Sequence, residues 1–179
     1  MNIRECFEKR LLREDRPDPR RSGRSMEVAE AKLEEAEKAL GYGLLDAAVI
    51  LAYTAMFHAA RAVLFRDGIV ERSHVCLIEY LKERYVKTGR MSGALINMLD
   101  SARVDRYETL YGLETRSSGR EAEHSLQRAK EFLLMVKTIL LNEKFERDTS
   151  PIPGCSRFPV AKEIDVFERL CARFMLSYH

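Results

Sequence analysis

The sequence predicts an all-α fold: an up-and-down antiparallel helical bundle of about five helices, with extra short helices at both termini. First, no proline lies between Pro19 and Pro151, and a long proline-free stretch favours helices because proline interrupts their hydrogen bonds. Second, this stretch is rich in Ala, Leu, Glu and Arg, which are strong helix formers. Third, its apolar residues recur at three- and four-residue spacing, which places them on one face of each helix.

Composition narrows the class of protein. The chain has 179 residues, 46% hydrophobic and 32% charged, which suits one domain with a hydrophobic core. Its 30 Lys and Arg nearly balance 28 Asp and Glu, which excludes a generally polycationic nucleic-acid binder. No apolar run reaches the about 18 residues of a membrane span, and the N-terminus is charged from Arg4 onward. We therefore expect no membrane segment and no signal peptide.

Cysteine usage predicts a reducing compartment. The four cysteines are far apart and form no Cys-x-x-Cys pair; they are Cys6, Cys76, Cys155 and Cys171. Neither a zinc site nor a disulfide framework is indicated by this pattern. We expect a cytoplasmic protein with reduced thiols, no metal and no cofactor.

The chain divides into three parts. Residues 1–24 form a basic extension in which a short apolar stripe predicts a helix, and the segment 16–24, with two prolines and a glycine, predicts a linker. Residues 25–145 form the bundle. Residues 146–179 contain three prolines and predict a second linker followed by an amphipathic helix.

Local signals place the helices of the bundle. Ser25, Ser73 and Ser92 each precede an apolar pattern and are candidate N-caps. Ser118 followed by Glu121 is a capping box. Together with the glycines between the patterns, these signals predict helices at about 26–40, 44–66, 74–86, 92–110 and 120–145. Helix 44–66 is apolar on all sides around its alanines, so we expect it to be central and buried.

That central helix carries unexpected polar residues. Tyr53 and Arg61 share one face, and His58 lies between them. Such side chains are costly to bury unless partners are supplied. Two interpretations remain open: a core network that fixes helix register, or a polar cleft between helices. His74, at the start of the next helix, belongs to the same candidate network.

A second polar group lies near the end of helix 92–110. Its candidate phosphate-binding residues are Arg103, Arg106, Tyr107 and Tyr111, with Lys87 as an outer contact. Guanidinium groups make forked contacts to phosphate, and tyrosine offers a stacking face. Ordinary ion pairs with Asp105 and Glu108 are an equally good explanation of the arginines from spacing alone.

Four segments together resemble the HEPN family of small prokaryotic helical domains. They are 29–36, Tyr53 with 56–62, 73–74 with 85–89, and Arg106 with Tyr111 and Gly112. The resemblance covers about residues 25–145. It implies a homodimer, and for many members a metal-independent ribonuclease in which an Arg, followed four to six residues later by a His, acts on the phosphate and the ribose 2′-hydroxyl.

This chain departs from that pattern, because no His follows Arg106 before His124. A tyrosine with a pKa near ~10 is a poor base at neutral pH. We therefore expect a non-catalytic or weakly catalytic module that binds nucleotide or RNA and acts with a nucleotidyltransferase, plausibly as a toxin–antitoxin pair. In some paired systems the transferase adds AMP to a tyrosine, for which Tyr107 and Tyr111 are the candidates here. One alternative is an endoribonuclease using Arg106 with a His outside the motif, with His58 as the candidate. The other is a purely structural interaction bundle.

Overall fold

The fold is described by a computed structural model covering residues 1–113 and 117–148. Met1–Glu146 forms one compact unit. Its elements are α1 (Ile3–Glu8), β1 (Leu12–Glu14), α2 (Pro19–Gly41), α3 (Leu45–Arg66), β2 (Ile69–Glu71), α4 (His74–Leu81), the π-helix η1 (Lys82–Val86), α5 (Gly93–Tyr111) and α6 (Gly119–Asp148). The all-α prediction is confirmed, and the predicted C-terminal helix lies outside the described residues.

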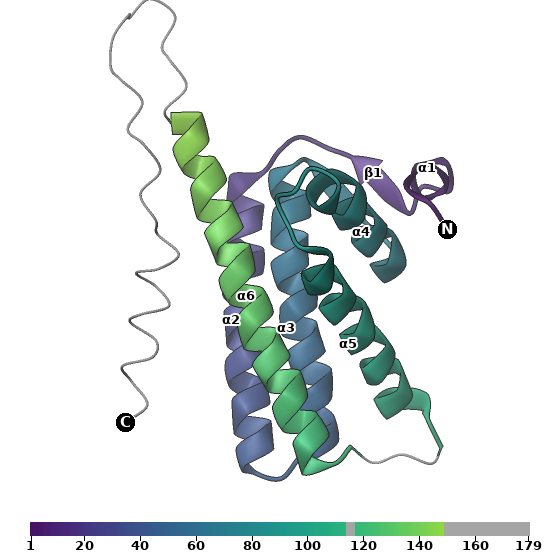
Figure 1. The fold of residues 1–179 in the computed structure, drawn as a ribbon, viewed down its shortest axis with the longest axis vertical. Helices are drawn as coiled ribbons and strands as arrows, with labels where there is room; N and C mark the ends of the chain where they lie inside the picture. Colours follow the sequence, from purple (N-terminus) through teal and green to yellow (C-terminus); the bar gives the residue numbers. More distant parts are fainter. Residues whose placement is uncertain (114–116, 149–179) are drawn as a thin grey trace, which may run out of the picture. The chain divides into compact units, whose positions relative to one another are not determined.

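Helix α3 forms the centre of the bundle, as predicted from its apolar composition. It packs against α2 and α5, and α6 runs alongside α2 through two ion pairs, Lys130–Glu37 and Lys137–Glu30 (Figure 1). By length and hydropathy alone α3 is also long enough to cross a membrane, but 67% of its most apolar window is buried inside the protein. The core helix of a globular bundle meets the same criteria, so this finding is weak evidence for a span.

Three predicted N-caps are confirmed by hydrogen bonds. Ser73 accepts a bond from the Cys76 amide, and Ser92 accepts one from the Leu95 amide. Ser118 and Glu121 form the reciprocal bonds of a capping box at the start of α6. These caps supply partners for amides that the first helical turn leaves unpaired.

The predicted start of the first long helix is wrong. Helix α2 begins at Pro19 rather than after Ser25, because the Asp18 side chain caps the Arg21 amide. Proline is well tolerated in the first turn, where its missing N–H would be unpaired anyway. The segment read as a linker is therefore helical from Pro19 onward. Ser25 is instead buried mid-helix, and its hydroxyl donates to the carbonyl of His58.

A small antiparallel sheet was not predicted. Strands β1 and β2 pair with Leu12 opposite Glu71, but three residues are too few to show the alternation that identifies a strand. Gly68 precedes β2 with φ +75°, and a Cβ there would lie 2.5 Å from the Asp15 carbonyl oxygen. This turn therefore requires glycine.

The expectation of reduced thiols is wrong for two cysteines. Cys6 in α1 and Cys76 in α4 form a disulfide, with their Cα atoms 5.7 Å apart. Both residues are fully buried. The 70 residues between them hid this pairing from sequence patterns, because only the packing of α1 on α4 brings them together.

Candidate functional site

One arginine of the predicted phosphate-binding group is unpaired. Arg103 pairs with Asp100 at 2.8 Å, within α5. Asp105, which the sequence offered as a partner for these arginines, instead pairs with Arg128 of α6 at 3.2 Å. Half-buried Arg106 makes no ion pair or hydrogen bond with any described residue. Its guanidinium therefore keeps all its donors free for a ligand.

A tyrosine–histidine pair lies beside this arginine. Tyr53 of α3 and His74, the first residue of α4, share a hydrogen bond between the phenol oxygen and Nδ1 at 2.5 Å. The His74 ring also stacks on Phe57, with ring centroids 4.0 Å apart. The cap at Ser73 and this stack together set the position of the imidazole. Phe57 was not among the predicted site residues, although it lies one helical turn from both Tyr53 and Arg61.

The fold joins the two predicted polar groups. The Arg106 guanidinium carbon lies 6.0 Å from the centre of the Tyr53 ring. Burial lowers the pKa of His74 below its usual 6.5, and the positive charges of Arg106, Arg103 and Arg61 lower it further. Burial raises the pKa of Tyr53 far above 10, opposed by Arg106 and Arg103. At neutral pH the site therefore presents a neutral imidazole and a neutral phenol beside a free guanidinium.

Two exposed tyrosines extend the site along α5. Tyr107 is 55% exposed and Tyr111 is 62% exposed. Their rings lie 5.0 Å apart at an interplanar angle of 50°. They follow Arg106 by one and five residues, so the free cation and the exposed rings belong to the same end of one helix.

The other predicted residues lie outside this group. The side chain of His58 makes no hydrogen bond with any described residue, and the histidine that pairs with Tyr53 is His74. Burial, Arg61 and Lys32 lower the pKa of His58, with no contribution from Arg106. Arg61 pairs with the buried carboxylate of Glu71 at 2.7 Å. Lys87 is exposed and pairs with Glu83 at 2.7 Å.

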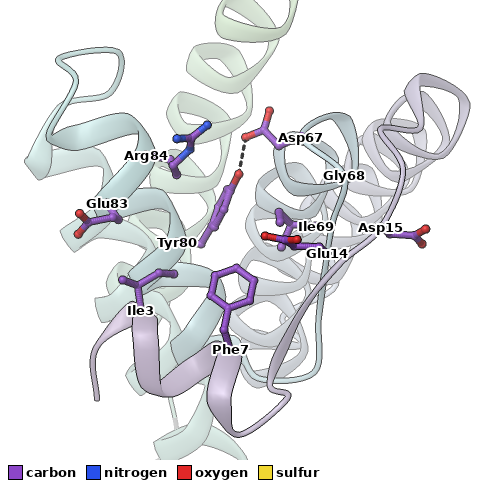
Figure 2. A pocket seen from close by; sticks show the side chains of 10 residues that line it. All are labelled: Ile3, Phe7, Glu14, Asp15, Asp67, Gly68, Ile69, Tyr80, Glu83 and Arg84. Atoms are coloured by element: carbon purple, nitrogen blue, oxygen red, sulfur yellow. Dashed lines mark hydrogen bonds between the residues drawn. The ribbon is translucent and has the colours of Figure 1, made fainter.

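A cavity among the described residues lies elsewhere. Figure 2 shows this pocket of about 400 Å³, where Ile3 and Phe7 of α1 face Tyr80 of α4. The Tyr80 hydroxyl donates to Asp67 at 3.0 Å. None of the predicted site residues lines it. We place the candidate site at Arg106, because a half-buried guanidinium with no ion pair among the described residues is suited to an anionic ligand, whereas the cavity contains none of the predicted residues.

The described part of the chain contains no cluster of side chains that could bind a metal ion. Within residues 1–113 and 117–148, no three His, Cys, Asp or Glu side chains are placed to hold a metal ion. What the described chain does present around Arg106 is a half-buried arginine of α5 beside the Tyr53–His74 pair of α3 and α4.

The structure is an all-α bundle in which Arg106 of α5 lies beside Tyr53 of α3 and His74 of α4. The chain belongs to the HEPN family: the model of the HEPN domain matches residues 23–139, from within α2 to within α6. The resemblance seen in the sequence is thereby confirmed. No curated protein matches the chain. Membership in this family supports a module that works on nucleotides or RNA.

Proposed function

We propose that the chain is a HEPN-family binding module that holds a phosphate of a nucleotide or of RNA at Arg106. The carrying observation is the half-buried Arg106 guanidinium, which has no ion pair or hydrogen bond among the described residues, whereas Arg103 and Arg128 are both paired. Partial burial strengthens a charge-assisted hydrogen bond to phosphate relative to one in open water. Arg103 lies one turn away and adds positive charge at the edge of the site.

Replacement of Arg106 tests this proposal. In Arg106→Ala we expect affinity for a labelled single-stranded RNA to fall by about 1.5–3 kcal/mol, the usual scale for a hydrogen bond to a charged group. Binding is measured by fluorescence anisotropy, and affinity falls with added salt. Arg24→Ala is the matched control, because it removes the same charge from an exposed position on α2. If both variants lose the same RNA affinity, the loss reflects only the change in net charge, and the site at Arg106 is refuted.

A second function, metal-independent RNA cleavage, is favoured by one observation. His74 hydrogen-bonds to Tyr53, whose ring lies 6.0 Å from the Arg106 guanidinium carbon, and burial and Arg106 lower the pKa of His74, which suits a general base beside a phosphate. In this reaction the ribose 2′-oxygen attacks phosphorus, the bond to the 5′-oxygen breaks, and His74 accepts the 2′-hydroxyl proton. The departing 5′-oxygen takes up a proton, which leaves a 2′,3′-cyclic phosphate and a 5′-hydroxyl.

His74→Gln separates cleavage from binding. If the second function is present, this variant loses cleavage by about 100-fold or more in EDTA and still binds RNA, while His58→Gln keeps the wild-type rate. Because the pKa of His74 is lowered, the wild-type rate rises with pH in the acid range and levels off by neutral pH. Absence of wild-type cleavage in EDTA would eliminate this function and leave the binding proposal standing.

The proposal extends to partners. We propose a homodimer that acts with a nucleotidyltransferase, as a toxin–antitoxin pair; the Cys6–Cys76 disulfide does not support the cytoplasmic location expected from the sequence. This assembly is what the resemblance to the HEPN family implies. Exposed apolar side chains on α6 are a second support, because such residues commonly mark interfaces; they are Leu134, Met135 and Leu141.

A further inference from the structure

We propose that the pocket shown in Figure 2 binds an aliphatic diamine, with one ammonium group at Glu14 and the other at Glu83. This binding goes beyond the proposed function, because none of the residues placed around Arg106 lines the pocket. The pocket has a volume of about 400 Å³, which lies in the range typical of small-ligand sites. Its walls come from α1, β1, the turn before β2, α4 and η1.

The lining of the pocket is acidic. It carries four carboxylates and one guanidinium, that of Arg84, and Arg84 is exposed, so water weakens its charge interactions. Glu14 makes no ion pair or hydrogen bond with any described residue. Glu83 pairs with Lys87 at 2.7 Å, but the Lys87 side chain is 68% exposed, and such surface pairs contribute little. Glu14 and Glu83 are therefore available to a cationic ligand.

The middle of the pocket is apolar and aromatic. Figure 2 shows Phe7 and Tyr80 between Glu83 and Glu14, with Ile69 beside Glu14. A hydrocarbon stem can pack on these side chains and leave water, and aromatic rings attract ammonium groups. An apolar middle with a carboxylate at each end matches a diamine, whose two charges are separated by methylene groups.

The inner wall of the pocket is held in place by the fold. Tyr80 donates its hydroxyl to Asp67 at 3.0 Å, and Tyr85 donates to the same carboxylate at 2.8 Å. Burial and the charge of Asp67 raise the pKa of Tyr80, so its ring stays neutral at physiological pH. Helix α1 is tied to α4 by the disulfide. Glu83 belongs to η1, and π-helical turns are frequent at functional sites.

The placement of the carboxylates favours an organic cation over a metal ion. In the part of the chain that the structure describes, no group of three acidic, histidine or cysteine side chains could hold a metal. Calcium and magnesium require several oxygen ligands around one point. A diamine instead brings its two charges to two separate carboxylates.

Three ligands with the same hexane stem test the pocket on the full chain. They are diaminohexane, hexylamine and hexanediol, which carry two, one and no charges. NMR titration at low salt measures each affinity from the amide signals of Gly68 and Ile69, which line the pocket. We expect affinity to fall in that order. Hexylamine binding as tightly as diaminohexane would refute the two-ended arrangement. Hexanediol binding equally well, or no shift of these two signals with diaminohexane, would refute cation recognition at this pocket.

Replacing the two carboxylates tests the residues themselves. Glu14→Gln/Glu83→Gln keeps the size of both side chains, and we expect affinity for diaminohexane to fall about 2- to 30-fold, the range for two exposed ion pairs. The matched control is Glu27→Gln/Glu34→Gln, which removes two charges from exposed positions on α2 and should bind as the wild type does. Equal losses in the two double variants would show general attraction of cations and overturn the inference.

Discussion

Replacing Arg61 by methionine is expected to lower the free energy of unfolding by up to about 3–5 kcal/mol, the cost of removing one member of a fully buried ion pair, because the Arg61 side chain is 26% exposed and its partner is buried. The Arg61 Nε lies 2.7 Å from Oε1 of Glu71, whose side chain is only 5% exposed. Its other oxygen, Oε2, is buried without a hydrogen-bond partner among the described residues. Loss of the guanidinium leaves this carboxylate with an uncompensated charge inside the protein.

The double variant Arg61→Met/Glu71→Met provides the control. Removing both charges replaces the pair by apolar side chains, and we expect most of the lost stability to return. Urea unfolding followed by far-ultraviolet circular dichroism measures each variant. A double variant no more stable than Arg61→Met would show that the pair is not coupled. If the double variant regains stability, the role of Arg61 is to attach β2 to α3. This is the core-network interpretation that the sequence left open.

Helix existence and most helix starts were predictable because both depend on local chemistry. The apolar spacing of α3 and the caps at Ser73, Ser92 and Ser118 act over a single turn, so each can be read from a few consecutive residues. The predicted start of α2 was wrong because a local signal was misinterpreted. Pro19 was read as a helix breaker, although the preceding Asp18 supplies the cap that makes proline favourable in a first turn.

The site was predictable only in its parts. Tyr53 and His74 are 21 residues apart, and Arg106 is on a third helix, so no spacing rule connects them. The sequence also did not show which arginine forms an ion pair with which carboxylate. The sequence offered Asp105 to Arg103 or Arg106, whereas the fold pairs it with Arg128. Arg106 itself has no acidic residue three or four positions away in α5, so helical spacing gives it no ion-pair partner within the helix.

Loss of the Cys6–Cys76 disulfide is expected to lower the free energy of unfolding by about 4 kcal/mol. Two cysteines 70 residues apart close a long loop, and cross-linking a loop of this length removes about that much conformational free energy from the unfolded chain. Thermal unfolding of the wild type with and without reductant measures the difference, and Cys6→Ala/Cys76→Ala should match the reduced protein. Cys155→Ala/Cys171→Ala serves as the control that leaves the bond intact.

Peptide mapping under non-reducing conditions identifies the bond directly. Equal stability of the oxidised, reduced and double-alanine proteins would show that the two thiols are unlinked, as the sequence predicted for a cytoplasmic chain. If the oxidised protein is more stable, the disulfide also helps to hold helix α1 in place. Helix α1 has six residues, too few to be stable alone, so its position depends on its contacts with α4 and on this bond. Since α4 begins at His74, RNA affinity measured on oxidised and reduced protein also tells whether the attachment of α1 contributes to the geometry of the site.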